Sequence, residues 1–272
     1  MFLHLLTIET RKLFKNPILW ADLGILTIIF AAYFTVRYAI IAEAVRNGLG
    51  NTRGLELDLQ VGLGLFGNFS VLFYAATAAI ISADDYPDRS IQMWLTRGAP
   101  RALLLLTRVV IILVIGLFLT IFIIGMILAL AMLMRTAFLG GFTAQNLNWV
   151  QLLPATLRIF AASIPYLALT VLLGVVSRSP LFAAGGTLVF ATVVEKLLEG
   201  WSDNYPALIQ FIPSHLSQLL LFNNYAIDRT ARPMILGGAY LHESQVFITI
   251  GFFLLVFSAL SLVIFSRQDL GG

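Results

Sequence analysis

The sequence has 272 residues, of which 59% are hydrophobic and 11% charged, and its mean hydropathy is +0.92. Soluble domains average about 45–50% apolar and about 25% charged residues, so this composition excludes an ordinary soluble protein and indicates an integral membrane protein. A net charge of +3 without any long basic run excludes nucleic-acid binding, and the lack of Cys excludes disulfides and thiolate chemistry.

The N-terminal residues 1–16 have the pattern of an amphipathic helix lying in the membrane interface. The apolar side chains fall on one side of this helix and the basic ones on the other: Phe2, Leu3, Leu6 and Leu13 against His4, Arg11 and Lys15. Because Pro17 interrupts the pattern, we expect the first membrane span to begin just after it.

Long, predominantly apolar segments follow and indicate helical spans, since barrel strands would alternate with period two. The predicted fold is therefore an all-α membrane protein with six transmembrane helices in a single domain, residues 1–272. The expected spans are about 18–42, 59–83, 103–134, 153–176, 181–198 and 246–265. Residues 201–245 contain several prolines, and we expect one or two short helices there at the outer membrane face.

A polar segment, residues 84–101, separates the second span from the third. Asp84, Asp85 and Asp88 place negative charge where a helix begins, and Gly98 and Pro100 end it. About ten residues rise only ~15 Å, half of a bilayer core, so this helix cannot span. We expect it to lie along the membrane surface, with Ile91, Trp94 and Leu95 on the apolar face and Arg89, Gln92 and Thr96 on other faces.

Six spans place both termini on one side of the membrane. Basic residues are denser on that side, which includes residues 84–101, than on the other. The positive-inside rule therefore predicts that the termini lie in the cytoplasm and that the chain is a multi-pass protein of the cell (inner) membrane.

Three ionisable residues fall within or beside the later spans, and such residues are candidates for a substrate pathway or gate. They are Arg158, Glu195 and Lys196. The structural interpretation, that Arg158 extends to an interface and that the adjacent Glu195 and Lys196 serve as a cap or salt bridge, is favoured for each.

No catalytic motif accompanies these residues. None of the three lysines, Lys12, Lys15 and Lys196, follows a Gly, so the sequence holds no phosphate-binding G-x-x-x-x-G-K-[ST] loop. The run from His242 to Val246 resembles a zinc-protease motif but has Val246 where the second His is required. We expect no catalytic residue, no metal ligand and no cofactor in this chain.

Two motifs in this order resemble the permease subunits of ABC exporters of the type-2 class. The first is the acidic start of residues 84–101 followed by Ser90-Ile91-Gln92-Met93-Trp94-Leu95 and the turn Arg97-Gly98-Ala99-Pro100-Arg101. The second closes the last span as Phe265-Ser266-Arg267-Gln268-Asp269. The chain departs from the family pattern by Asp for the usual Glu and by Arg89 for a common Gly.

The resemblance covers essentially the whole chain and implies a transporter that moves its substrate by alternating access. Residues 84–101 would be the coupling helix that docks on a separate cytoplasmic P-loop ATPase, which binds ATP and Mg²⁺. The contacting residues implied are Asp84, Asp85, Asp88, Arg89, Gln92, Arg97 and Arg101. A second permease chain, identical or related, would complete the pathway within the lipid bilayer.

Two other functions stay open. One is a non-transporting membrane anchor or sensor subunit of a complex, which substrate-stimulated ATP turnover would distinguish from a transporter. The other is an intramembrane enzyme, which requires facing catalytic side chains within the spans. For contact between two permease chains, we expect the first, second and fifth spans, because small residues such as Gly62, Gly64, Gly67 and the run 183–186 allow close helix approach.

Overall fold

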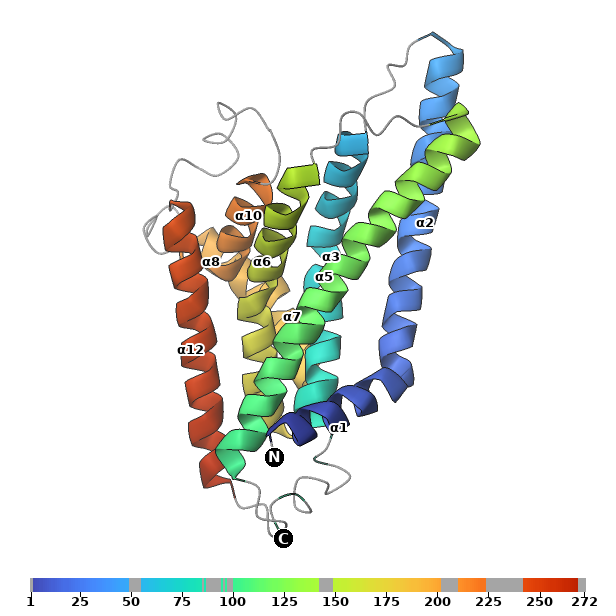
Figure 1. Ribbon diagram of the computed structural model, residues 1–272. Helices are drawn as coiled ribbons and strands as arrows, with labels where there is room; N and C mark the ends of the chain where they lie inside the picture. The colour runs from blue at the N-terminus through green and yellow to red at the C-terminus, as the bar shows by residue number, and fades with distance from the viewer. Residues whose placement is uncertain are drawn as a thin grey trace.

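A computed structural model describes residues 2–48, 55–84, 86, 94, 96, 100–141, 149–201, 210–223 and 242–268 (Figure 1). All regular elements within these ranges are helices, which confirms the all-α fold class. They are α1 (Phe2–Lys15), α2 (Pro17–Arg46), α3 (Leu55–Ala83), α5 (Arg101–Leu139), α6 (Trp149–Ser177), α7 (Pro180–Val189), the π-helix η1 (Phe190–Val194), α8 (Glu195–Gly200), α10 (Pro213–Asn223) and α12 (Glu243–Arg267).

Five helical stretches in the described ranges are long and apolar enough to cross a membrane. They are Pro17–Arg46, Arg101–Leu139, Leu152–Ser177, Pro180–Gly200 and Glu243–Arg267. In α3, the described apolar part is Phe69–Ala83, which is shorter. These helices form one upright bundle in Figure 1.

Several helices extend beyond the apolar runs from which they were predicted; α2, for example, continues to Arg46 and α3 begins at Leu55. The longest, α5, has 39 residues. At 1.5 Å per residue it measures about 58 Å, nearly twice the ~30 Å of a bilayer core. It runs obliquely through the bundle, and its two ends stand at opposite ends of the molecule (Figure 1).

A sharp corner at Asn16 separates α1 from α2. The Asn16 side chain accepts a hydrogen bond from the backbone N–H of Ile18 at 2.9 Å, and Pro17 occupies the first position of α2. The Trp20 indole also donates to the carbonyl oxygen of Phe14 at 2.8 Å. An N-cap followed by proline starts a helix in a new direction, so α1 lies across the end of the bundle (Figure 1).

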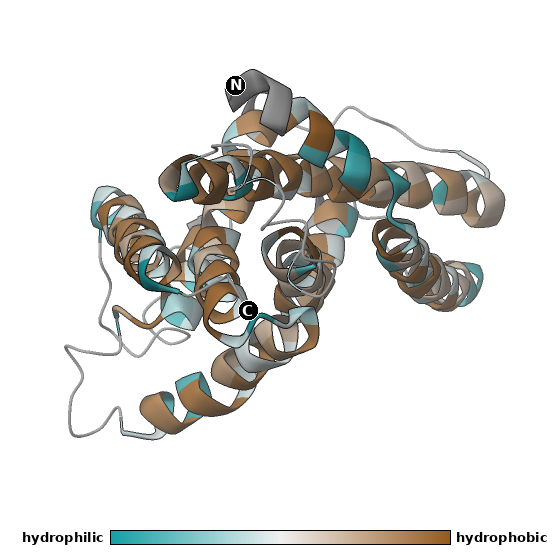
Figure 2. Ribbon diagram, turned by 90° about the horizontal axis from the view of Figure 1, so that it is seen from below, coloured by the Kyte–Doolittle hydropathy of each residue, from teal (hydrophilic) through white to brown (hydrophobic). Residues whose placement is uncertain are grey.

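The α1 helix has the two-sided character that the sequence predicts, as far as its side chains are described. Leu13 is buried in the core, whereas Arg11 and Lys15 are exposed. The side chains of Phe2, Leu3 and His4 lie outside the described part. Viewed from this end, Figure 2 shows hydrophilic segments on α1 over a largely apolar bundle. We call this end of the molecule the α1 end and the opposite one the far end.

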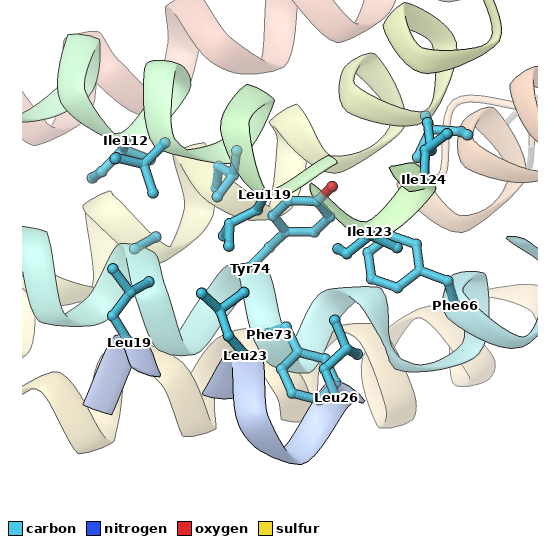
Figure 3. Packing of buried hydrophobic residues seen from close by; sticks show 14 of the residues in the cluster. Leu19, Leu23, Leu26, Phe66, Phe73, Tyr74, Ile112, Leu119, Ile123 and Ile124 are labelled. Carbon is cyan, nitrogen blue, oxygen red and sulfur yellow. The ribbon is translucent and has the colours of Figure 1, made fainter. Parts of the chain in front are cut away.

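The core lies between α2, α3, α5 and α6. Leucines of α2 and the aromatic side chains of Phe66, Phe73 and Tyr74 of α3 pack there against branched aliphatic residues of α5 (Figure 3). Tyr74 is the polar member of this group, and its hydroxyl lies 2.6 Å from Thr120 Oγ1. Because that hydrogen bond satisfies the buried hydroxyl, Tyr74 contributes its ring to the core without an unpaired polar atom.

One predicted role for small residues is corrected by the packing. A Cβ atom placed on Gly62 would lie 2.6 Å from Ile127 Cγ2 and 3.2 Å from Phe34 Cζ. Gly62 therefore allows α3 to approach α5 and α2 within the same chain and is not a surface for a second chain. In the fifth span, Gly186 packs on Leu173, whereas Gly185 has no neighbour within 4 Å.

Candidate functional site

Residues 84–101 connect the α1-end termini of α3 and α5, beside the end of α12. Of the residues expected to contact an ATPase, the structure describes Asp84 and Arg101. The others, Asp85, Asp88, Arg89, Gln92 and Arg97, lie outside the described residues. The described geometry of the site therefore consists of the two ends of this segment, Asp84 and Arg101, and of the helices around them.

At the first edge, Asp84 follows the last residue of α3 and faces α1. Its Oδ2 lies 3.9 Å from Lys12 Nζ, and both side chains are about two-fifths exposed, at 40% and 43%. A contact this long and this exposed contributes little stability, since water screens it. A shallow pocket lies between the two helices at this point, and its lining is Glu9, Lys12, Leu13, Asn16, Ile80, Ile81 and Asp84.

Within the segment, residues 94 and 96 are helical and differ in exposure. Trp94 is partly buried and packs against the main core, whereas Thr96 is exposed. Trp94 therefore holds this point of the segment to the bundle, and the faces of the segment as a whole stay a prediction. Tyr86, just before them, is also partly buried, and burial raises the pKa of its hydroxyl.

At the second edge, Arg101 begins α5 and binds the end of α12. Its Nη1 donates to the carbonyl oxygen of Ser266 at 2.7 Å and to that of Gln268 at 2.9 Å. These carbonyls belong to the last turn of α12 and the residue after it, where backbone acceptors lack helical partners. Arg101 therefore caps α12 from a different helix, which favours a positive charge at this position.

Further contacts join the neighbouring helices at the α1 end. Gln268 Nε2 donates to the carbonyl oxygen of Val175 on α6 at 2.6 Å. The buried Arg108 of α5 donates from Nη1 to the carbonyl oxygen of Ser82 on α3 at 2.8 Å. As a result, α3, α5, α6 and α12 are bound to one another around the two edges of residues 84–101. We call these contacts of Arg101, Arg108 and Gln268 the α1-end latch.

The far end holds a buried charge cluster that the sequence analysis missed. Asp58 Oδ2 lies 3.1 Å from Arg135 Nη1 of α5, and Asp58 Oδ1 lies 3.1 Å from Arg37 Nη2 of α2. The hydroxyl of Tyr38 also donates to Asp58 Oδ2. Asp58 is only 3% exposed. One carboxylate thus binds side chains from both neighbouring helices.

The cluster was missed because Asp58 was left outside the second predicted span, on account of its charge. In the structure α3 already begins at Leu55, so Asp58 is the fourth residue of this helix. The available signal was Arg37, an arginine inside the first apolar run that required a partner. Sequence spacing alone does not pair it with Asp58, because the pairing depends on how α2 packs against α3.

The three ionisable residues of the later spans occupy separate contacts. Arg158 Nε lies 2.6 Å from Glu243 Oε1, which joins α6 to the start of α12. Lys196 Nζ lies 2.6 Å from Glu199 Oε2 within α8. Glu195 is buried and accepts a hydrogen bond from the Tyr166 hydroxyl at 3.0 Å. Their role in a pathway stays a prediction. Within the described ranges, no group of three or more His, Asp or Glu side chains is placed to hold a metal ion.

The fold and these contacts define the class of the molecule as a helical, multi-pass membrane protein. A family model described as "Protein of unknown function (DUF2705)" matches residues 21–271. This match covers most of the chain, which therefore belongs to that family. A search of curated proteins finds no match.

Proposed function

We propose that this chain is the permease subunit of an ATP-driven exporter and that a separate cytoplasmic ATPase docks at its α1 end. The observation that carries the proposal is the α1-end latch. Residues 84–101 are joined at both edges to long helices, and Arg101 is bound directly to the end of α12. A partner that moves this segment would therefore move several membrane helices together.

The proposal includes a specific topology. Counting α3 and the composite helix α7–η1–α8 as one pass each, the chain crosses the membrane six times. Both termini, α1 and residues 84–101 then lie on the cytoplasmic side. The amphipathic α1 would rest in the inner membrane interface, with Arg11 and Lys15 toward the aqueous side.

Coupling would be mechanical. The ATPase would bind ATP and Mg²⁺, because the permease sequence lacks a phosphate-binding loop. Closure of two ATPase subunits would draw two permease chains between inward-open and outward-open states, a rigid-body change of the kind that packed helix bundles support. The described contacts suit such a change, since a latch made of side chain–carbonyl bonds keeps the helix ends together as they move.

Co-purification with the ATPase in graded salt tests the docking surface. Reversal of charge in the Asp85→Arg/Asp88→Arg variant should leave the permease folded but release the ATPase at lower salt than the wild type. Loss of charge pairs at the edge of an interface weakens association and makes it more sensitive to salt. Unchanged retention would contradict the docking role of this segment.

Asp84 requires its own control, because it contacts Lys12 within the chain. The single change Asp84→Lys alters both this contact and any contact with a partner. The double change Lys12→Asp/Asp84→Lys restores only the internal pair. If Asp84 binds the ATPase, both variants lose it. Recovery in the double variant would assign Asp84 to holding α1.

Transport itself separates this proposal from a non-transporting anchor or sensor subunit. The reconstituted complex should hydrolyse ATP faster when its substrate is present and should carry that substrate across a vesicle membrane. A complex that binds the ATPase stably but shows neither effect with the compounds whose export depends on it in the cell would favour the anchor or sensor function.

A further inference from the structure

The composite helix of the fifth span contains a carboxyl group that the permease proposal does not use. Glu195 is the first residue of α8, directly after the π-helix η1, and it is 0% exposed. Its Oε2 accepts one hydrogen bond, from the hydroxyl of Tyr166 on α6 at 3.0 Å. Among the residues that the structure describes, its Oε1 has no hydrogen-bond partner.

The charged groups around Glu195 are engaged elsewhere. Lys196 is largely exposed and pairs with Glu199 at 2.6 Å. Glu199 also accepts a hydrogen bond from Ser214 Oγ of α10 at 2.9 Å. His215 of α10 contributes no fixed positive charge, because burial lowers the pKa of its imidazole. No basic side chain in the described ranges lies within ion-pairing distance of Glu195.

The carboxyl groups of Glu195 and Glu199, one helical turn apart, therefore differ in whether their surroundings favour the ionised form. Glu199 has a lysine, a hydroxyl and partial exposure, all of which favour the carboxylate. Glu195 is fully buried, and the donors near its carboxyl group are neutral hydroxyls, that of Tyr166 at 3.0 Å and that of Ser214. An ionised carboxylate buried without a cation has a larger free-energy penalty than a neutral acid whose O–H lacks an acceptor. The negative charge of Glu199 nearby disfavours a second one further.

We infer that Glu195 is a proton-binding site at the far end of the bundle, one that stays occupied up to near-neutral pH in the folded chain. This inference rests on burial and contacts alone and holds whether or not the chain is an exporter. The Tyr166 hydroxyl donates to the carbonyl oxygen of the neutral acid, which fixes the carboxyl group against α6. Release of the proton would leave a buried anion and favour movement of Glu195 away from Tyr166, toward water.

The π-helix next to Glu195 supplies a local route for that movement. The backbone N–H of Glu195 bonds to the carbonyl oxygen of Phe190, five residues earlier, instead of to residue 191 as in an α-helix. Conversion of this turn to α geometry would rotate α8 by roughly 100° relative to α7, the angle that one residue spans. Such a rotation would separate Glu195 from Tyr166, and the state of the proton would then be linked to the register of the helix.

Infrared spectroscopy of the purified, full-length protein tests the protonation state directly. A protonated carboxylic acid has a carbonyl band distinct from that of a carboxylate. The difference spectrum of wild type minus Glu195→Gln at neutral pH should contain one such acid band, whereas wild type minus Glu199→Gln should contain carboxylate bands instead. A Glu195→Gln difference spectrum with carboxylate bands and no acid band would overturn the inference.

The Tyr166→Phe variant gives a second spectral readout that keeps Glu195 in place. Loss of the one hydrogen bond to its carbonyl oxygen should shift the acid band to higher frequency without abolishing it. This result distinguishes a protonated Glu195 held by Tyr166 from an acid band that originates elsewhere. A band that does not move in Tyr166→Phe would contradict the assignment.

Thermal unfolding as a function of pH gives an independent test. An unfolded glutamate titrates near pH ~4.3, whereas the folded Glu195 keeps its proton to higher pH. Above pH ~4.3 the folded state then binds more protons, so wild-type stability falls as pH rises. Glu195→Gln lacks this loss. The melting temperature of Glu195→Gln minus that of wild type should therefore increase by about 2–4 °C for each unit by which the pH is raised. Glu199→Gln should keep the wild-type slope, and a flat difference between Glu195→Gln and wild type would contradict the site.

Discussion

Asp58, the fourth residue of α3, binds Arg135 near the end of α5 at 3.1 Å, across 77 residues of sequence. The same carboxylate holds Arg37 of α2 at 3.1 Å, so one residue neutralises part of the charge of two arginines. Buried ion pairs are expensive to break, because removing one partner leaves the other charged and desolvated. Asp58 therefore fixes the far ends of three helices relative to one another.

The first prediction is that Asp58→Asn strongly destabilises the detergent-solubilised protein. The change leaves Arg37 and Arg135 without their counter-ion, and we expect a loss of about 3 kcal/mol or more in the free energy of unfolding. Glu43→Gln is the matched control, since it removes one negative charge from an exposed position of α2. Equal melting temperatures for the two variants would show that the cluster is not a structural contact.

The second prediction concerns Arg101 and the end of α12. Arg101→Met removes the two short hydrogen bonds to the carbonyls of Ser266 and Gln268 and a longer one to that of Phe265. Charge-assisted bonds of this kind are worth about 1.5–3 kcal/mol each when well shielded. Because Arg101 is only partly buried, we expect a smaller effect, about tenfold faster hydrogen exchange at the backbone amides of residues 264–268. Arg11→Met, on the exposed side of α1, should leave exchange there unchanged. Slow exchange in both variants would argue against the latch.

The third prediction compares glycines with and without neighbours. Gly62→Ala forces a methyl group against Ile127 and Phe34, and we expect about 1–3 kcal/mol of destabilisation from overpacking. Gly24→Ala on α2 meets nothing within 4 Å and should be neutral or stabilising by up to about 1 kcal/mol. Chemical unfolding of both variants in the same detergent measures the difference. A result in which Gly62→Ala is as harmless as Gly24→Ala would contradict the close packing of α3 against α5.

The fourth prediction tests contact between two copies of the chain, as the proposed function requires. The sequence contains no Cys, so any disulfide between two chains must come from the single introduced Cys. Gly185→Cys should form a disulfide-linked dimer in membranes, because position 185 is exposed on α7 and has no neighbour within 4 Å. Gly186→Cys should not, since a side chain there meets Leu173 at 2.9 Å. Equal cross-linking at both positions would indicate random collision in the membrane.

Several features of this protein could be predicted from local sequence because local chemistry determines them. The apolar runs predicted membrane helices, and the structure has helices at each of them, since a buried backbone must satisfy its own hydrogen bonds. Pro17 predicted the corner between α1 and α2. Trp94, which the sequence pattern placed on an apolar helix face, packs against the core.

Other features depend on which helices become neighbours, and local sequence does not contain that information. Asp58 received no role because its two arginines lie on other helices, and Gly62 was assigned to a partner chain although it packs on Ile127. The ATPase contact of Arg101 stays a prediction, whereas its bonds to the backbone carbonyls of α12 were not predicted, because carbonyls have no side-chain signature in sequence. Glu195 shows the same division: its position in a span was evident from the sequence. Its burial against Tyr166, without a cation, was decided by the packing of α8 on α6, because the cost of a charge depends on everything that surrounds it in three dimensions.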